Sequence, residues 1–247
     1  MRAIALVDLD DTLFQTLGKC PKDVPAEALA PIGYARDGAP LSYATPRQVG
    51  FLAWLSESTL LVPVTARSRD ALDRVRIDWT RAICAHGGVV LDSEGKADSG
   101  WRSRMAAEAG AHAEALADLA RRVGAEARGA ALRIRILEEE GLPLYLLVKH
   151  ETGDSAALAR VIERIVPHVP PGWTMHLNGN NAALLPPFLG KQHAVAYLIP
   201  QLRRQYPDTP VIGIGDSLTD APFMALCDFA MMPTHSQLAA AALLRAA

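Results

Sequence analysis

The sequence predicts an α/β fold in which a parallel-sheet domain is interrupted by an inserted α+β module. Short apolar runs alternate with helical segments at both ends of the chain, which is typical of a parallel sheet. Between about residues 90 and 186 the order changes to helix, hairpin, helix, hairpin. We therefore expect residues 1–89 and 187–247 to form one core domain and residues 90–186 to form an inserted α+β domain.

The first elements of the core follow from apolar runs and turn residues. Ala3–Val7 is a short apolar run that predicts a buried strand ending at Asp8. Residues 15–46 contain several prolines and predict an irregular loop or flap. Thr45 and Pro46 resemble a helix N-cap followed by proline in the first helical position. Further core elements are expected as a strand at 60–64, a helix at 70–79 and a strand at 82–85.

The remaining elements divide between the insert and the returning core. In the insert, residues 132–136 alternate apolar side chains with arginine, which predicts a half-buried strand. The insert is expected to contain helices at 101–127 and 155–166 and strands at 132–136, 142–148, 173–177 and 182–185. The returning core is expected to contain helices at 191–198 and 220–226 and strands at 211–214 and 229–232.

Composition excludes several classes of protein. The chain is 50% hydrophobic and 21% charged with a net charge of −2, so no broad electrostatic attraction to nucleic acid or anionic membrane is expected. No run of about 18 apolar residues predicts a membrane span. The N-terminal apolar run is too short for an export signal. Three cysteines, Cys20, Cys84 and Cys227, form no metal-type cluster and suit a reducing, cytoplasmic location.

A carboxylate pair carries the strongest indication of chemistry. Asp8 and Asp10 follow the first strand, at the edge of an α/β sheet where ligands bind. Carboxylates brought into one pocket repel each other, and Mg²⁺ relieves that repulsion through oxygen ligands. Asp8 is then a candidate nucleophile toward phosphorus, and Asp10 a candidate general acid and base. The alternative is an acidic turn that caps the strand without any catalytic role.

Three further motifs are individually weak. Thr65, followed by Ala66 and Arg67, could bind phosphoryl oxygen through its hydroxyl and the nearby amides, although threonine also begins many helices as an N-cap. Lys191 could offset phosphoryl charge, although surface lysines are common. Asp216 and Asp220 lie four residues apart in a glycine-flanked loop, which suits a cation site or merely the acidic start of a helix.

Together, in this order, the four motifs resemble those of the haloacid dehalogenase superfamily. The resemblance covers both ends of the chain and implies a Rossmann-like core (the HAD fold). It implies Asp8 as nucleophile, Asp10 as acid and base, and Thr65 and Lys191 on the phosphoryl group. It also implies Mg²⁺ held by Asp8, by the backbone carbonyl of Asp10 and by Asp216, with Asp220 assisting.

The position of the insert, between the second and third motifs, is similar to the Cof-type and sucrose-phosphatase-like branch, whose large α/β caps cover the site. That branch implies a small phosphorylated substrate such as a sugar phosphate. His86, Asn178 and Asn181, with Arg67, are candidate substrate contacts, or else ordinary turn and hairpin residues. Two other functions remain open, a phosphomannomutase-like sugar phosphomutase and a non-catalytic binder of phosphometabolites. The sequence does not indicate an oligomeric state.

Overall fold

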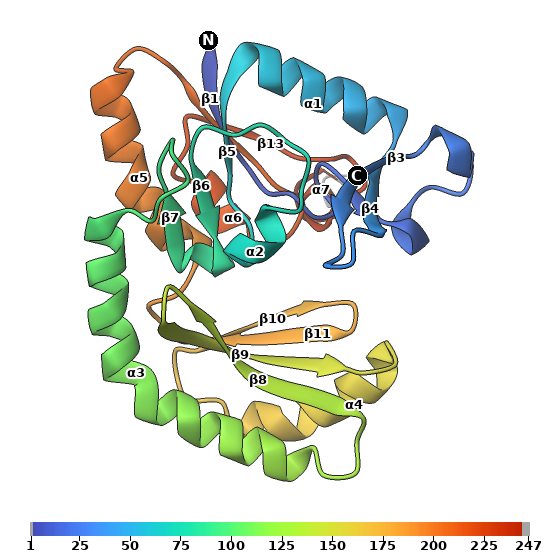
Figure 1. Ribbon diagram of the computed structural model, residues 1–247, viewed down its shortest axis with the longest axis vertical. Coiled ribbons are helices and arrows are strands. Elements are labelled where there is room, and N and C mark those ends of the chain that lie inside the picture. Colours follow the sequence, from blue (N-terminus) through green and yellow to red (C-terminus); the bar gives the residue numbers. More distant parts are fainter. Residues whose placement is uncertain (1, 244–247) are drawn as a thin grey trace. The chain divides into compact units, whose positions relative to one another are not determined.

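The computed structural model describes residues 2–243, apart from the side chain of Asn178, and contains two compact units (Figure 1). Unit 1 consists of residues 2–98 and 191–243, and unit 2 of Ser99–Gly190. The predicted α/β class with a parallel core sheet is confirmed. The first segment of unit 1 extends to Asp98, beyond the expected boundary at residue 89. The reason is that residues 89–91 form a strand that pairs with the strand at 82–84 of unit 1.

The centre of unit 1 is a four-stranded parallel sheet in the order β13-β12-β1-β5. Its strands are β13 (Phe229–Met231), β12 (Val211–Ile214), β1 (Ala3–Val7) and β5 (Thr59–Pro63). An isolated parallel bridge between Val64 and Ile83 connects the end of β5 to the pair β6 (Ala82–Cys84) and β7 (Val89–Leu91). The helices of this unit are α1 (Pro46–Ser58), α2 (Arg69–Leu72), α5 (Lys191–Gln205), α6 (Ala221–Met224) and α7 (Gln237–Ala242).

The local pattern of β1 and α1 agrees with the sequence. Every residue of β1 is buried, as expected for a central strand with helices on both faces. The N-cap at Thr45 is confirmed as a capping box, in which the Thr45 side chain accepts from the backbone amide of Gln48 and the Gln48 side chain accepts from the amide of Thr45. Leu55 of α1 packs into the same apolar cluster as Val7 and Leu61 of the sheet.

The prediction of an irregular segment at 15–46 is wrong. The segment forms a three-stranded antiparallel sheet in the order β2-β4-β3, built from β2 (Gln15–Thr16), β3 (Ala30–Tyr34) and β4 (Pro40–Ala44), with short 3-10 helices at Leu17–Lys19 and Ala26–Ala28. Its prolines are compatible with pairing because Pro31 lies in the edge strand β3 and Pro40 is the first residue of β4. Proline is tolerated at both kinds of position.

The prediction of a helix at 70–79 is also largely wrong. Only α2 is helical, and the chain beyond it runs extended beside β3. Tyr34 donates its amide to the carbonyl of Arg74 (3.0 Å), and Arg76 donates to the carbonyl of Ile32 (2.8 Å). Hydrogen bonds to a strand some forty residues earlier in the chain therefore replace the expected helical ones.

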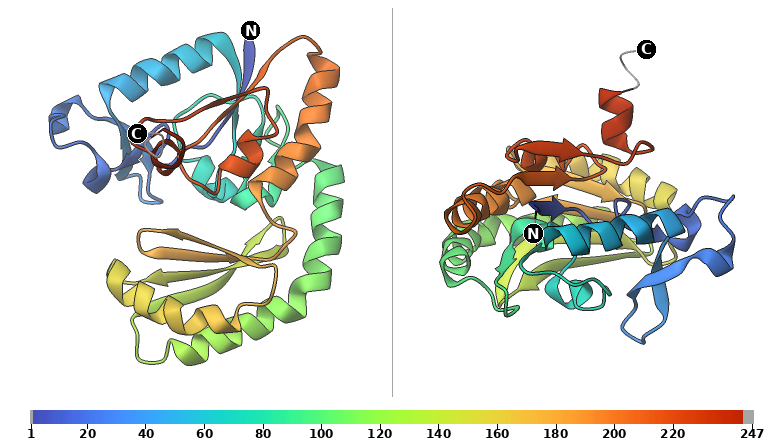
Figure 2. Two further views of the ribbon diagram at one scale, coloured as in Figure 1. Left: turned by 180° about the vertical axis from the view of Figure 1, so that it is seen from behind. Right: turned by 90° about the horizontal axis from the view of Figure 1, so that it is seen from above.

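Unit 2 contains one antiparallel four-stranded sheet in the order β10-β11-β9-β8. Its elements are α3 (Ser99–Glu126), β8 (Leu132–Glu139), β9 (Leu142–His150), α4 (Ser155–Ile165), β10 (Thr174–Asn178) and β11 (Asn181–Leu185). Both helices lie on one face of the sheet, as Figure 1 and, from behind, the left view of Figure 2 show. No helix among the described residues is long and apolar enough to cross a membrane.

Candidate functional site

Polar residues follow three neighbouring strands at one edge of the unit 1 sheet. Asp8 follows β1, Thr65 follows β5 and Asp216 follows β12. Because β1 pairs in parallel with both neighbours, the carboxyl ends of all three strands meet at the same edge, where open α/β sheets bind ligands. Lys191 begins α5, and Asp220 immediately precedes α6.

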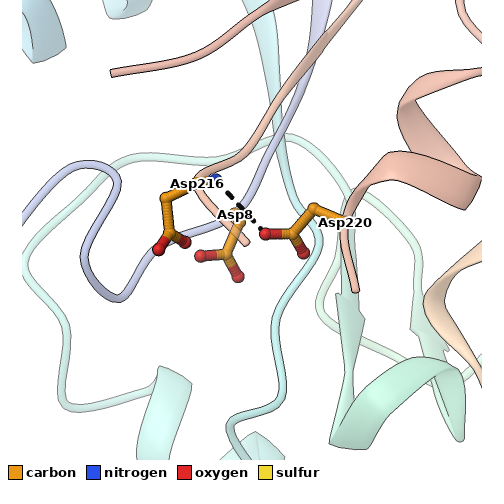
Figure 3. Close-up of side chains that lie close together, drawn as sticks. All are labelled: Asp8, Asp216 and Asp220. Atoms are coloured by element: carbon orange, nitrogen blue, oxygen red, sulfur yellow. Dashed lines mark hydrogen bonds between the residues drawn. The ribbon is translucent and has the colours of Figure 1, made fainter. Parts of the chain in front are cut away.

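Three carboxylates converge at this edge (Figure 3). Asp8, Asp216 and Asp220 each offer a carboxylate oxygen within 4.8 Å of the others. Asp8 and Asp220 are buried, and Asp216 is partly buried. Three hard oxygen donors with this spacing fit a divalent cation such as Mg²⁺, whose charge would offset their mutual repulsion. Asp8, Asp216 and Asp220 were all predicted to take part in metal binding, and the fold brings these three side chains together.

Thr12 connects two of these carboxylates. Its hydroxyl is placed to donate either to Asp8 Oδ2 or to Asp216 Oδ1, each at 3.3 Å. The sequence indicated no role for Thr12. Its position four residues after Asp8, within the tight turn that follows β1, could have indicated a contact with that carboxylate. Thr12 therefore fixes the orientation of the nucleophile candidate relative to the loop after β12.

Lys191 is shared between two acids. Its Nζ donates to Asp8 Oδ1 and to Asp220 Oδ1, both at 2.6 Å, and all three side chains are buried. Burial opposes the charge on Lys191, but the two carboxylates outweigh it and hold the lysine pKa above its usual range. The ammonium is thus fixed next to Asp8, where it could neutralise charge on a bound phosphoryl group.

The pKa values of the three clustered aspartates are shifted in different directions. Burial raises the pKa of Asp8, and the attraction of Lys191 only partly offsets it. Burial, together with Asp220 and Asp11, raises the pKa of Asp216 to about 6. For Asp220, burial is outweighed by Lys191 and by hydrogen bonds from Ser217, so its pKa lies below the usual range. A bound cation would reverse the upward shifts, because it favours the ionised forms.

Asp10 forms an ion pair with Arg67. Arg67 donates from Nε to Asp10 Oδ2 (2.8 Å) and from Nη2 to Asp10 Oδ1 (2.7 Å). The same guanidinium donates to Ser42 Oγ (3.2 Å) and lies 5.1 Å from the ring centroid of Phe14. Burial works against its charge, but Asp10 outweighs burial and raises the pKa of Arg67. The sequence indicated neither the ion pair nor the contact with Ser42, which comes from the segment expected to be irregular.

The turn after β5 is tied to the loop after β6. Thr65 is fully buried, and its Oγ1 accepts from the backbone amide of Arg67 (3.1 Å), with Ala66 between them. Ala85 donates its amide to the carbonyl of Arg67 (2.7 Å), and His86 donates to the carbonyl of Thr65 (3.2 Å). Both Ala85 and His86 have positive φ values, 50° and 55°, which non-glycine residues adopt at a cost of about 1–3 kcal/mol. His86 is therefore placed beside the predicted phosphate-binding turn.

The loop after β12 depends on a glycine. A Cβ at Gly215 would lie 2.6 Å from Cβ of Asp220, so no larger residue fits without moving that acid. Asp220 Oδ2 accepts from the amides of Asp216 (3.3 Å) and Ser217 (3.1 Å). The glycine thus lets the chain pass close to the acid that both orders the loop and binds Lys191.

Two candidate substrate contacts belong to unit 2. Asn181 begins β11, and its Nδ2 donates to Asn180 Oδ1 (3.3 Å). The backbone of Asn178 pairs with Asn181 across the hairpin, whereas the Asn178 side chain lies outside the described residues. The role of these asparagines in substrate binding stays a prediction.

A scan against protein-family models found no matching model, and a search of curated proteins found no match. Solved structures do match. A trehalose-6-phosphate phosphatase related protein is 18% identical, with a TM-score of 0.50 over 95% of this chain and 90% of its own. The C-terminal domain of a C. albicans trehalose-6-phosphate phosphatase is 15% identical, with a TM-score of 0.56 over 90% and 72% of the two chains.

A protein from Plasmodium vivax, assigned as a HAD/Cof-like hydrolase, is 13% identical, with a TM-score of 0.56 over 96% of this chain and 86% of its own. At these identities the likeness concerns the fold. The chain has the fold of haloacid dehalogenase-like hydrolases, and the predicted resemblance is confirmed at that level.

Proposed function

We propose that this protein is a Mg²⁺-dependent phosphoric monoester hydrolase that acts on a small phosphorylated metabolite through an aspartyl-phosphate intermediate. One observation carries the proposal most directly. The buried Lys191 ammonium is shared between Asp8 and Asp220, and Asp216 lies within ligand distance of both acids. The side chains proposed as nucleophile, as phosphoryl-neutralising cation and as metal ligands therefore lie together at the edge of the sheet where open α/β folds bind ligands.

In the proposed first half-reaction, a carboxylate oxygen of Asp8 forms a bond to phosphorus while the bond from phosphorus to the ester oxygen breaks. Asp10 gives its proton to the departing alkoxide. Thr65 and the amides that follow it hold the phosphoryl oxygens, and Lys191 offsets their charge. Mg²⁺, when bound by Asp8, Asp216, Asp220 and the Asp10 carbonyl, would supply further electrostatic stabilisation of the phosphoryl group.

In the second half-reaction Asp10 accepts a proton from a water molecule, which attacks phosphorus and releases Asp8 and inorganic phosphate. The same carboxyl therefore acts first as acid and then as base. Both steps require Asp10 to have a carboxyl oxygen available to substrate or water, although Arg67 engages both oxygens in this structure.

We further propose that unit 2 acts as a cap that contacts the part of the substrate remote from the phosphoryl group. The four motifs all lie in unit 1, so the chemistry does not need unit 2. One structural neighbour is a domain of a trehalose-6-phosphate phosphatase and another is a trehalose-6-phosphate phosphatase related protein, which favours a sugar phosphate as substrate.

A phosphate-release screen over sugar phosphates, with Mg²⁺ and with excess chelator, tests this function. We expect Mg²⁺-dependent release of inorganic phosphate that the chelator abolishes. Full turnover in the chelator would contradict the metal requirement. Conversion of a hexose 1-phosphate to its isomer without phosphate release would identify a mutase instead.

A further inference from the structure

The solvent side of α1 carries an exposed stripe of four residues. Leu55 is the buried residue of this helix and packs in the apolar core of unit 1, so α1 lies at the surface of that unit (Figure 2). Arg47, Gly50, Trp54 and Glu57 follow one another at intervals of three, four and three residues, so they form one line along the helix. All four are exposed. We call these four residues the α1 stripe.

Trp54 is the large aromatic residue of the stripe and is 46% exposed. Its ring stacks on that of Phe51, with the centroids 5.7 Å apart and an angle of 18° between the planes. Phe51 is partly buried and packs against the core of unit 1. An aromatic side chain that is already fixed loses little conformational entropy on binding, and tryptophan is enriched among the residues that dominate protein–protein interfaces. Trp54 therefore has the properties of an interface anchor.

Gly50 lies one turn before Trp54, and the fold of the single chain does not require a glycine there. A Cβ added at Gly50 would meet no atom within 4 Å. Glycine inside a helix costs about 0.5–1 kcal/mol relative to alanine. The absent side chain does, however, leave the helix backbone open to close approach by a bulky group from another molecule.

The two charged residues of the stripe are placed against the helix dipole. Anions stabilise the first turn of a helix and cations stabilise the last. In α1 the first turn contains the cation Arg47 and no acid, and the last turn contains the anion Glu57 and no base. Among the described residues no ion pair involves Arg47 or Glu57. Each charge would therefore be stabilised by an opposite charge from outside the chain.

We propose that α1 is the interface of a symmetric homodimer, in which the helices of two copies pack antiparallel along the α1 stripe. Leu52 is the midpoint in sequence between Arg47 and Glu57, and it is also the midpoint between Gly50 and Trp54. A two-fold axis at the level of Leu52 thus brings Arg47 beside Glu57 of the second copy and Trp54 over Gly50 of the second copy. In a two-fold interface each contact occurs twice, so one arrangement satisfies both charges and both rings.

The size of the contact sets the expected affinity. A helix of 13 residues is about 20 Å long and about 10 Å wide, so two such helices bury less than the usual 1,200–2,000 Å² or so of a stable complex. We therefore expect a reversible dimer with a dissociation constant of about 1–100 μM.

Reversal of single charges tests the interface. Glu57→Arg and Arg47→Glu each replace two attractive contacts by two repulsive ones, so each should weaken dimerisation by about 10-fold or more in sedimentation equilibrium of the full chain. The two variants change the net charge in opposite directions, so a common loss cannot arise from net charge. The control is Arg204→Glu on α5, which reverses another exposed arginine and should leave the dissociation constant unchanged.

Recombination of the charges tests the antiparallel geometry. The double variant Arg47→Glu/Glu57→Arg should regain the affinity of the wild type. An equimolar mixture of the two single variants should form a heterodimer, because every reversed charge then meets its opposite. Trp54→Ser should weaken dimerisation by about 10-fold or more, since it removes the anchor. Circular dichroism checks that all variants are folded.

The outcomes decide the proposal independently of the enzymatic function, since no residue of the α1 stripe takes part in the proposed chemistry. A wild-type chain that stays monomeric up to about 500 μM would overturn it, because a dimer of the expected affinity would then predominate. A dimer that both charge reversals leave intact would place the interface elsewhere. Single variants that dissociate but are not rescued by the double variant or by mixing would exclude the antiparallel pairing.

Discussion

Arg67 engages both carboxylate oxygens of Asp10, at 2.8 Å and 2.7 Å, although the two residues are 57 positions apart in the chain. The proposed mechanism needs Asp10 to give and take a proton. Its carboxyl must therefore exchange part of this ion pair for substrate or water during each cycle. Arg67, which the sequence suggested only as a substrate contact, is placed as the residue that positions Asp10.

Replacement of Arg67 tests this positioning. Arg67→Lys keeps the charge but loses the two parallel hydrogen bonds, so we expect kcat on an aryl phosphate to fall about 10-fold or more. KM should change less, because the proposed partner is the acid and not the substrate. In the Asp10→Asn background the same substitution should have little further effect, since coupled residues are not additive. A rise in KM alone would indicate a substrate contact.

Asp8→Asn should abolish turnover, since the amide cannot form the aspartyl phosphate. Asp10→Asn should instead lower the rate by about 10²–10⁴-fold, which is the usual contribution of proton transfer. Phosphate release measures both, and circular dichroism confirms that the variants remain folded. Near wild-type turnover by the Asp8 variant would refute its assignment as nucleophile.

Lys191→Met should destabilise the protein by about 3–5 kcal/mol, because Asp8 and Asp220 would lose the buried cation that both contact at 2.6 Å. Urea unfolding without added metal measures the change. Lys96→Met is the matched control, because Lys96 forms an exposed ion pair with Glu94, and its loss should cost about 1 kcal/mol or less. Similarly small decreases in the free energy of unfolding of both variants would contradict a structural role for the Lys191 ammonium.

The stability of the metal-free protein should depend on pH through the protonation of Asp216. Its pKa is raised to about 6 from an ordinary 3.8, so the folded state binds this proton more tightly than the unfolded state. The resulting stabilisation is complete below about pH 4 and is lost as the pH rises through about 6. Mg²⁺ requires the ionised carboxylate, so its stabilising effect should increase over the same interval.

Thermal unfolding of the wild type and of Asp216→Asn, at pH 4.5 to 7.5 and constant ionic strength, measures both effects. The asparagine variant should lose this part of the pH dependence and most of the stabilisation by Mg²⁺. An identical dependence on pH and Mg²⁺ in the two proteins would exclude Asp216 as the titrating metal ligand.

The local features of this protein could be predicted from its amino-acid sequence. The buried run that forms β1, the N-cap at Thr45 and the apolar alternation of β8 are each decided by neighbouring residues, so their patterns are readable in the chain. The alternation of strands and helices predicted the parallel sheet, and because parallel strands end at one edge, the residues that follow them, Asp8, Thr65 and Asp216, lie near one another.

The contacts between segments distant in sequence could not be predicted and became evident in the folded chain. The chain at 73–77 pairs with β3 instead of continuing α2, and the proline-containing segment forms a sheet whose Ser42 reaches Arg67. The same holds for the ion pair of Arg67 with Asp10 and for the sharing of Lys191 between Asp8 and Asp220. Local periodicity does not predict such partners, since a long-range hydrogen bond or ion pair forms only after the intervening chain has folded.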